Sequence, residues 1–122
     1  MEKKKILIVD DEKDLVDSVK IALEVNHYAV FAAYDGEQAF QMVEEVNPDL
    51  IVLDIMLPKK DGFQVCEQLK KDPKYANIPV IMLTAKEQEE DIKLAKKVGA
   101  NAYISKPFEI GLLFYNITNL LK

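Results

Sequence analysis

The sequence predicts a doubly wound α/β fold, in which five parallel strands alternate with helices as (βα)5. Three observations support this prediction: short apolar runs recur along the chain, segments of helical spacing separate them, and turn-forming pairs mark the junctions. Runs without a polar face are typical of strands covered on both sides of a parallel sheet. Because crossovers between parallel strands are right-handed, we expect helices on both faces and the strand order 2-1-3-4-5.

Five segments are expected to form the sheet. Four are nearly continuous in Ile, Leu and Val, which suits strands with no exposed face, and the segment that comes second is less continuous. In chain order the expected strands are Lys5–Val9, Tyr28–Tyr34, Asp49–Leu53, Pro79–Leu83 and Ala102–Ser105.

The segments between the strands carry apolar stripes at helical spacing. The clearest stripes are Leu15, Val19, Ala22 and Leu23, then Ala39, Val43 and Val46, then Phe63, Cys66 and Leu69. The pairs Asp35-Gly36 and Asp61-Gly62 precede two of these stripes, where helix starts belong. Cys66 is the chain's single cysteine, so it has no internal disulfide partner, and its place on a stripe predicts a buried thiol.

Length and charge limit the functions that the chain can have. The 122 residues fit one domain, 1–122, and the formal net charge is -5. All sixteen basic residues are lysine, so bidentate arginine contacts to bases or phosphates are excluded, and we expect no direct nucleic-acid binding by this domain. The first apolar run is too short to span a membrane, so we expect no membrane association and a cytoplasmic location.

Polar residues follow four of the expected strands. Asp10-Asp11 follow the first, Asp54 the third, Thr84 the fourth and Lys106 the fifth. Ligands of an open parallel sheet bind beyond the carboxyl ends of its strands, so these side chains are expected to share one pocket. Each feature alone is weak, since adjacent acids after a strand are also common as helix caps.

Three neighbouring carboxylates would raise each other's pKa unless a cation lay among them. Mg²⁺ prefers oxygen ligands and retains several waters, so it suits such a site, and Mn²⁺ can substitute for it. Lys106 and the hydroxyl of Thr84 would then be free to hold the oxygens of a phosphoryl group. The pattern therefore predicts a magnesium-dependent phosphoryl site.

These motifs resemble those of the receiver domains of bacterial two-component response regulators, over essentially the whole chain. The family has a flavodoxin-like (βα)5 sandwich and acts as a phosphoacceptor switch rather than as an enzyme that turns over a substrate. The matching stretches are Ile6–Glu12, Pro48–Pro58 with Asp61-Gly62, Pro79–Ala85, Gly99-Ala100 and Lys106–Phe108.

The resemblance implies a role for each residue of the pocket. Asp54 would be the phosphoacceptor, while Thr84 and Lys106 would grip the phosphoryl group. The Lys106–Pro107 bond would be cis, a state that only an X-Pro bond reaches at modest cost. The implied Mg²⁺ ligands are Asp11, Asp54, the backbone carbonyl of Met56 and, through water, Asp10.

The resemblance also implies a switch and its partners. Phosphorylation would draw Thr84 inward, and Tyr103 would rotate into the vacated space. The surface that changes would be the fourth helix, fifth strand and fifth helix. The phosphoryl donor would be a sensor histidine kinase or a histidine phosphotransfer protein, and the recipient of the signal an output domain or a downstream protein.

Two departures from the family bear on that surface and on the lifetime of the phosphoryl group. Dimerisation on phosphorylation is compatible with the resemblance, but the acidic and arginine pairs of winged-helix regulators are missing. The apolar run Ile110–Tyr115 either packs internally or binds a partner. Met56 and Lys86 stand where the family positions an attacking water, and neither offers a carboxamide or carboxylate, so we expect slow self-dephosphorylation.

Three alternatives remain open at the level of sequence. A haloacid-dehalogenase-like phosphatase would show Asp-x-Asp-x-Thr after the first strand, and this chain does not. A flavin binder would need a glycine- and hydroxyl-rich loop there, where Asp10-Asp11 would repel the phosphate. A phosphorylation-independent interaction module is the third alternative, although all five pocket residues are present.

Overall fold

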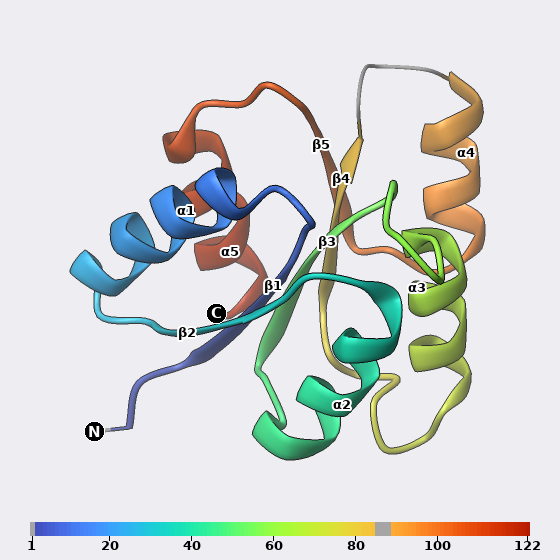
Figure 1. The fold of residues 1–122 in the computed structure, drawn as a ribbon, viewed down its shortest axis with the longest axis horizontal. Coiled ribbons are helices and arrows are strands. Elements are labelled where there is room, and N and C mark those ends of the chain that lie inside the picture. Colours follow the sequence, from blue (N-terminus) through green and yellow to red (C-terminus); the bar gives the residue numbers. More distant parts are fainter. Residues whose placement is uncertain (1, 85–88) are drawn as a thin grey trace.

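The computed structural model describes residues 2–84 and 89–122, in which strands and helices alternate (Figure 1). All five strands are parallel and lie in one sheet of order β2-β1-β3-β4-β5, which confirms the predicted fold class. The strands are β1 (Lys5–Val9), β2 (Ala29–Ala33), β3 (Leu50–Asp54), β4 (Val80–Thr84) and β5 (Ala102–Ser105). The helices are α1 (Lys13–Val25), α2 (Gly36–Val46), α3 (Gly62–Lys71), α4 (Glu89–Lys97) and α5 (Ile110–Leu120).

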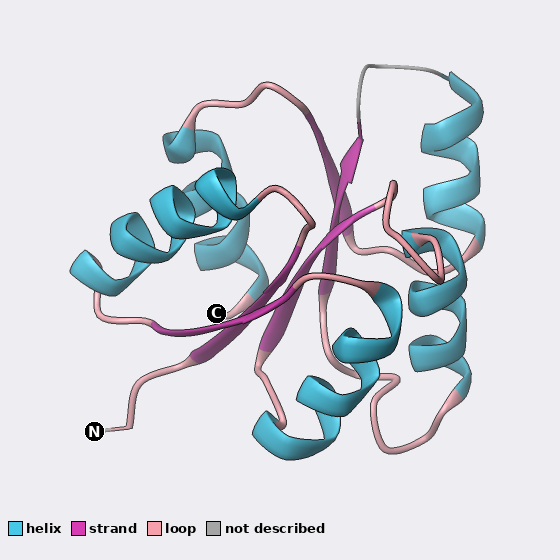
Figure 2. Cartoon of the chain, in the orientation of Figure 1, coloured by secondary structure: helices cyan, strands magenta, loops and turns pink. Residues whose placement is uncertain are grey.

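The sheet is the middle layer of three. In Figures 1 and 2, α1 and α5 cover one face, and α2, α3 and α4 cover the other. Successive side chains of a strand point to opposite faces, so the continuous apolar run of β1 supplies both cores. Ile6 and Ile8 pack in the cluster that holds residues of α1 and α5, and Leu7 and Val9 pack in the cluster with residues of α2 and α3.

Two strands begin and end one residue later than expected. β3 ends at Asp54 and β4 ends at Thr84, so both residues belong to the sheet instead of following it. Asp54 is in register with Leu83, and Thr84 with Ser105. A short polar residue can end a buried strand when its neighbours bury it, and here Asp54 is 5% and Thr84 0% exposed.

Aspartates cap the two helices that the Asp-Gly pairs predicted. Asp35 begins α2 and accepts a hydrogen bond from the backbone N–H of Gln38 (2.8 Å). Asp61 begins α3 in a capping box, in which its side chain accepts from the backbone N–H of Gln64 and the Gln64 side chain accepts from that of Asp61.

The thiol of Cys66 is buried, as expected, and donates to the carbonyl of Val98 (3.6 Å). Burial raises its pKa to about 11, so it is a weak nucleophile near neutral pH.

The apolar run Ile110–Tyr115 at the start of α5 packs internally in part and is exposed in part. The Phe114 ring packs edge-on against Tyr28, at 6.1 Å between centroids, whereas Tyr115 is 64% exposed. Among the described residues, no helix has the length and apolar content needed to cross a bilayer.

Candidate functional site

Three acidic side chains meet at the carboxyl edge of the sheet. Asp10 and Asp11 follow β1, and Asp54 ends the neighbouring strand β3. A hydrogen bond from the backbone N–H of Asp10 to the carbonyl of Ala33 (3.1 Å) ties the turn after β1 to the end of β2. One carboxylate oxygen from each of the three acids lies within 4.8 Å of the others, as the strand-end pattern predicted.

Lys106 brings a positive charge into this group from the end of β5. Its Nζ lies 2.7 Å from Asp10 Oδ2, 3.3 Å from Asp54 Oδ2 and 3.2 Å from Glu12 Oε1. Burial alone would lower the lysine's pKa, but contact with Asp10 and the charges of Asp54 and Asp10 outweigh it and raise the pKa to about 12. The ammonium therefore stays charged at physiological pH. The Lys106–Pro107 peptide bond is cis, as expected.

The carboxyl group of Asp54 is electrostatically unfavourable in its ionised form. Burial, and then repulsion from Asp10, raise its pKa from 3.8 to about 6, against the opposing charge of Lys106. The backbone N–H of Met56 donates to Asp54 Oδ1 at 3.3 Å, a long contact that compensates only part of the lost hydration. Without a further cation, ionised Asp54 therefore costs the folded state free energy.

This cost predicts that Asp54→Asn stabilises the metal-free protein. A carboxyl group whose pKa is raised by folding makes the protein less stable as pH rises from the unfolded pKa, 3.8, through the folded pKa of about 6. We therefore expect Asp54→Asn to raise the free energy of unfolding by about 2 kcal/mol at pH 8, after allowance for solvent screening, and to have no such effect towards pH 4. Urea denaturation in EDTA at both pH values measures it. The same gain at both pH values, or a loss at pH 8, would contradict this explanation.

The donor set fits a hard divalent cation. The cavity lined by Asp11, Glu12, Asp54, Met56 and Lys106 has a volume of about 330 Å³, enough for an ion with several waters. Asp10 is fully buried, and its Oδ2, although close to Lys106, has no hydrogen bond of good geometry within the described residues. A bound cation would stabilise both the buried Oδ2 of Asp10, which lacks such a bond, and the ionised form of Asp54, whose pKa is raised.

Two other expected site residues are not among those that line the acidic cavity: Thr84 ends β4, and Tyr103 lies two residues before the end of β5. Thr84 is buried, and its hydroxyl lies 3.5 Å from the carbonyl of Ile104 and 3.5 Å from Ser105 Oγ, both on β5. Tyr103 is 38% exposed, with Lys96 Nζ 5.9 Å from its ring centroid. The side chain of Met56 is 68% exposed at the pocket, and Lys86 lies outside the described residues.

Sequence reasoning missed two contacts of this site. Glu12 was quoted only as part of a motif, yet its carboxylate pairs with Lys106, 94 residues further along the chain. Ser105 had no assigned role, yet its hydroxyl lies beside that of Thr84. The expected fourth and fifth strands could have indicated the second contact, since their last residues are neighbours in a parallel sheet.

An acidic pocket with a lysine, at the carboxyl ends of the strands of a doubly wound sheet, is typical of α/β domains that bind a divalent cation and a phosphoryl group. Comparison with family models specifies the family, because the model described as "Response regulator receiver domain" matches residues 6–118. The chain belongs to this family, the receiver domains of two-component systems, whose members are signalling phosphoacceptors that bind Mg²⁺ at an acidic pocket.

Individual relatives are consistent with this family assignment. The chain is 49% identical over 105 residues to the alkaline phosphatase synthesis transcriptional regulatory protein PhoP of Bacillus subtilis (strain 168). That match covers 86% of this chain and 43% of the relative, so the chain spans less than half the length of PhoP. Two solved structures are similar over 98% of this chain. A putative response regulator from Chloroflexus aurantiacus J-10-fl is 33% identical, with a TM-score of 0.93 and 98% of its own chain covered. The chemotaxis response regulator CheY4 of Vibrio cholerae is 28% identical, with a TM-score of 0.91 and 99% covered.

Proposed function

We propose that this chain is a single receiver domain, residues 1–122, whose phosphoacceptor is Asp54. The donor is a phosphohistidine of a sensor histidine kinase or of a histidine phosphotransfer protein, and the signal passes to an output domain or a downstream protein. The observation that carries the proposal is that Asp11, Asp54 and Lys106 line one cavity, while the buried carboxylate of Asp10 lies 2.7 Å from Lys106 Nζ and within 4.8 Å of the other two acids. With the family as its support, the cytoplasm remains the proposed location.

Asp54 is suited to act as the nucleophile. One of its carboxylate oxygens forms the new bond to phosphorus as the N–P bond of phosphohistidine breaks, and the imidazole leaves with its electron pair and takes up a proton. Lys106 Nζ, 3.3 Å from Asp54 Oδ2, is close enough to pair with an oxygen of the transferred group. Its raised pKa keeps that charge in place.

Mg²⁺, held by Asp11, Asp54, the carbonyl of Met56 and, through water, Asp10, would neutralise charge that develops on the phosphoryl oxygens. Asp10 and Asp11 place their carboxylates around Asp54 and prepare the site for that ion. The pocket catalyses only the protein's own phosphorylation and its slow reversal by water.

This mechanism predicts phosphorylation by a small-molecule donor only in the presence of a divalent cation. Intact-mass analysis after incubation with acetyl phosphate should show one added phosphoryl group with Mg²⁺ or Mn²⁺ and none with EDTA. No mass gain with Mg²⁺ would favour a phosphorylation-independent interaction module. Sustained release of phosphate from a phosphomonoester would favour a phosphatase of similar fold.

The switch from Thr84 to Tyr103 that the family resemblance implies is supported by the contacts of Thr84 along β5. The hydroxyl of Thr84 has only long contacts to β5, at 3.5 Å, which a charged phosphoryl oxygen can outcompete. Its inward movement opens space beside Ser105, which shares a sheet face with Tyr103 two residues earlier. We expect the Tyr103 side chain to turn inward when beryllofluoride mimics the phosphoryl group, and a crystal structure of that complex measures it. An outward Tyr103 in the complex would contradict the switch.

The surface that reports this switch is formed by α4, β5 and α5. Leu94, Tyr103, Leu112 and Tyr115 are each at least 38% exposed there. A cavity of about 520 Å³ lined in part by Tyr103, Phe108 and Leu112 lies beside them. An inward turn of Tyr103 would change both the apolar area and the shape of this surface, which is the kind of change that a binding partner can read.

A further inference from the structure

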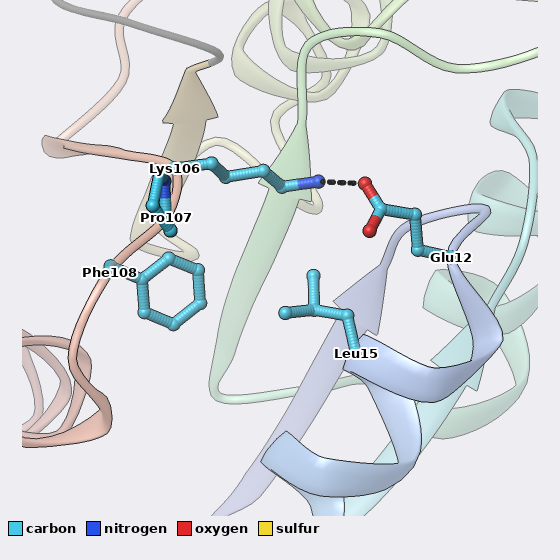
Figure 3. Close-up of a pocket in the computed structure, with 5 residues that line it drawn as sticks. All are labelled: Glu12, Leu15, Lys106, Pro107 and Phe108. Atoms are coloured by element: carbon cyan, nitrogen blue, oxygen red, sulfur yellow. Dashed lines mark hydrogen bonds and ion pairs between the residues drawn. The ribbon is translucent and has the colours of Figure 1, made fainter.

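Glu12 occupies the N-cap position of α1 but does not cap the helix. Ser, Thr, Asp or Asn usually stands at such a position, and its oxygen accepts from the first turn. The Glu12 side chain makes no cap hydrogen bond, and its backbone N–H donates to Asp10 Oδ1 at 2.9 Å. Its carboxylate instead lies 3.2 Å from Lys106 Nζ, a contact marked by the dashed line in Figure 3. The Glu12 side chain therefore pairs with Lys106 instead of capping α1.

The ion pair of Glu12 and Lys106 lies between two cavities. Both residues line the acidic pocket of about 330 Å³, and both line an apolar neighbour of about 390 Å³. In Figure 3 the lysine extends across to the Glu12 carboxylate, with Leu15 and Phe108 beside the apolar cavity. A change in the ion pair therefore changes how Lys106 enters the acidic pocket.

Lys106 would compete with a divalent cation for the same carboxylates. Its Nζ is 2.7 Å from Asp10 Oδ2 and 3.3 Å from Asp54 Oδ2, and both carboxylates belong to the cluster suited to an ion. Two cations on these oxygens repel each other, so an entering ion weakens the hold of Asp10 on the lysine. Among the described residues, Glu12 is the further carboxylate that already contacts this ammonium.

We propose that Glu12 is a positioning residue that retains Lys106 at the mouth of the pocket when a divalent cation takes Asp10 and Asp54. The ammonium then remains within reach of an arriving phosphoryl group and does not swing into solvent. This inference rests on the proposed function, because it requires the cation site. It adds a role for a side chain that is 64% exposed and outside the set of pocket residues.

Mg²⁺ binding measured by isothermal titration calorimetry tests the proposal in a double-mutant cycle. Glu12→Gln should weaken Mg²⁺ binding about threefold, the size expected for an exposed ion pair. Lys106→Met alone should tighten binding, since it removes a competing cation. In the Lys106→Met background, Glu12→Gln should change affinity by less than about 1.5-fold, because no lysine remains to be retained. Equal weakening in both backgrounds would overturn the proposal, since Glu12 would then act as a distant charge on the ion.

The variant Glu12→Asp tests whether the length of the Glu12 side chain matters in addition to its charge. Aspartate keeps the charge and caps helices well, but it is one methylene shorter, so it should weaken Mg²⁺ binding as Glu12→Gln does. Native-like affinity in Glu12→Asp would also overturn the proposal. Asp14→Asn, an exposed acid in the first turn of α1, is the matched control and should leave affinity unchanged. If the native protein binds no Mg²⁺, the proposed metal site fails as well, whereas binding without coupling between Glu12 and Lys106 overturns this inference alone.

Discussion

Asp54→Asn is expected to abolish phosphorylation of the chain by acetyl phosphate in the presence of Mg²⁺. The carboxamide has the shape of the carboxylate, so the fold is kept, but its oxygen is a far weaker nucleophile than a carboxylate oxygen. The loss should be complete within the detection limit of intact-mass analysis. In EDTA at pH 8 the same variant should be more stable than the native protein, as expected above, because the raised pKa of Asp54 indicates an unfavourable buried charge.

Asp61→Asn is the matched control for that loss. Asp61 precedes α3 on the same loop as the pocket, is exposed, and caps the helix through its side-chain oxygen, a role that asparagine performs equally well. This variant should accept one phosphoryl group as the native protein does. A phosphoryl group on Asp54→Asn, located by fragmentation to Asp10 or Asp11, would show that the acceptor was assigned to the wrong carboxylate of the cluster.

The fold followed from the sequence because its determinants are local. A strand without a polar face, such as residues 50–53, is recognisable from its own side chains, and the expected stripe on α1 included Val19 and Leu23, which are buried, but missed the buried Val16. The Asp-Gly pairs marked helix starts for the same reason. Strand limits were less accurate, since whether Asp54 or Thr84 belongs to the sheet depends on pairing with β4 and β5.

The pocket was predictable as a set of strand ends, but its contacts were not. Parallel strands bring their carboxyl ends to one edge, so the proximity of Asp10, Asp11 and Asp54 needed only the topology. The direction of the Thr84 hydroxyl and the pairing of Glu12 with Lys106 depend on side-chain orientation. Contacts between residues so far apart leave no periodic signal in a single sequence.

Gly62→Ala is expected to destabilise the protein by about 3 kcal/mol or more, because β3 and the start of α3 leave no room for a methyl group. A Cβ at Gly62 would overlap the carbonyl oxygen of Asp54 and lie 2.7 Å from the Cα of Ile55. These are backbone atoms, so no rotamer change relieves the overlap. The close approach is held by the hydrogen bond from the backbone N–H of Gly62 to the carbonyl of Ile55 (2.9 Å). Urea denaturation measures the loss.

Gly111→Ala is the matched control, since it makes the same substitution in the first turn of another helix. A Cβ at Gly111 meets no atom within 4 Å among the described residues, so alanine should stabilise α5 by a few tenths to about 1 kcal/mol through its higher helix propensity. If Gly62→Ala lowers the free energy of unfolding and Gly111→Ala raises it, the loss at Gly62 is due to local crowding and not to helix propensity. Because the crowded atoms belong to the backbone of the proposed phosphoacceptor and of Ile55 next to it, Gly62→Ala should also slow phosphorylation by acetyl phosphate under conditions where it remains folded. A stable Gly62→Ala protein that is phosphorylated at the native rate would show that β3 can yield without moving Asp54, and the glycine would then matter for helix initiation alone.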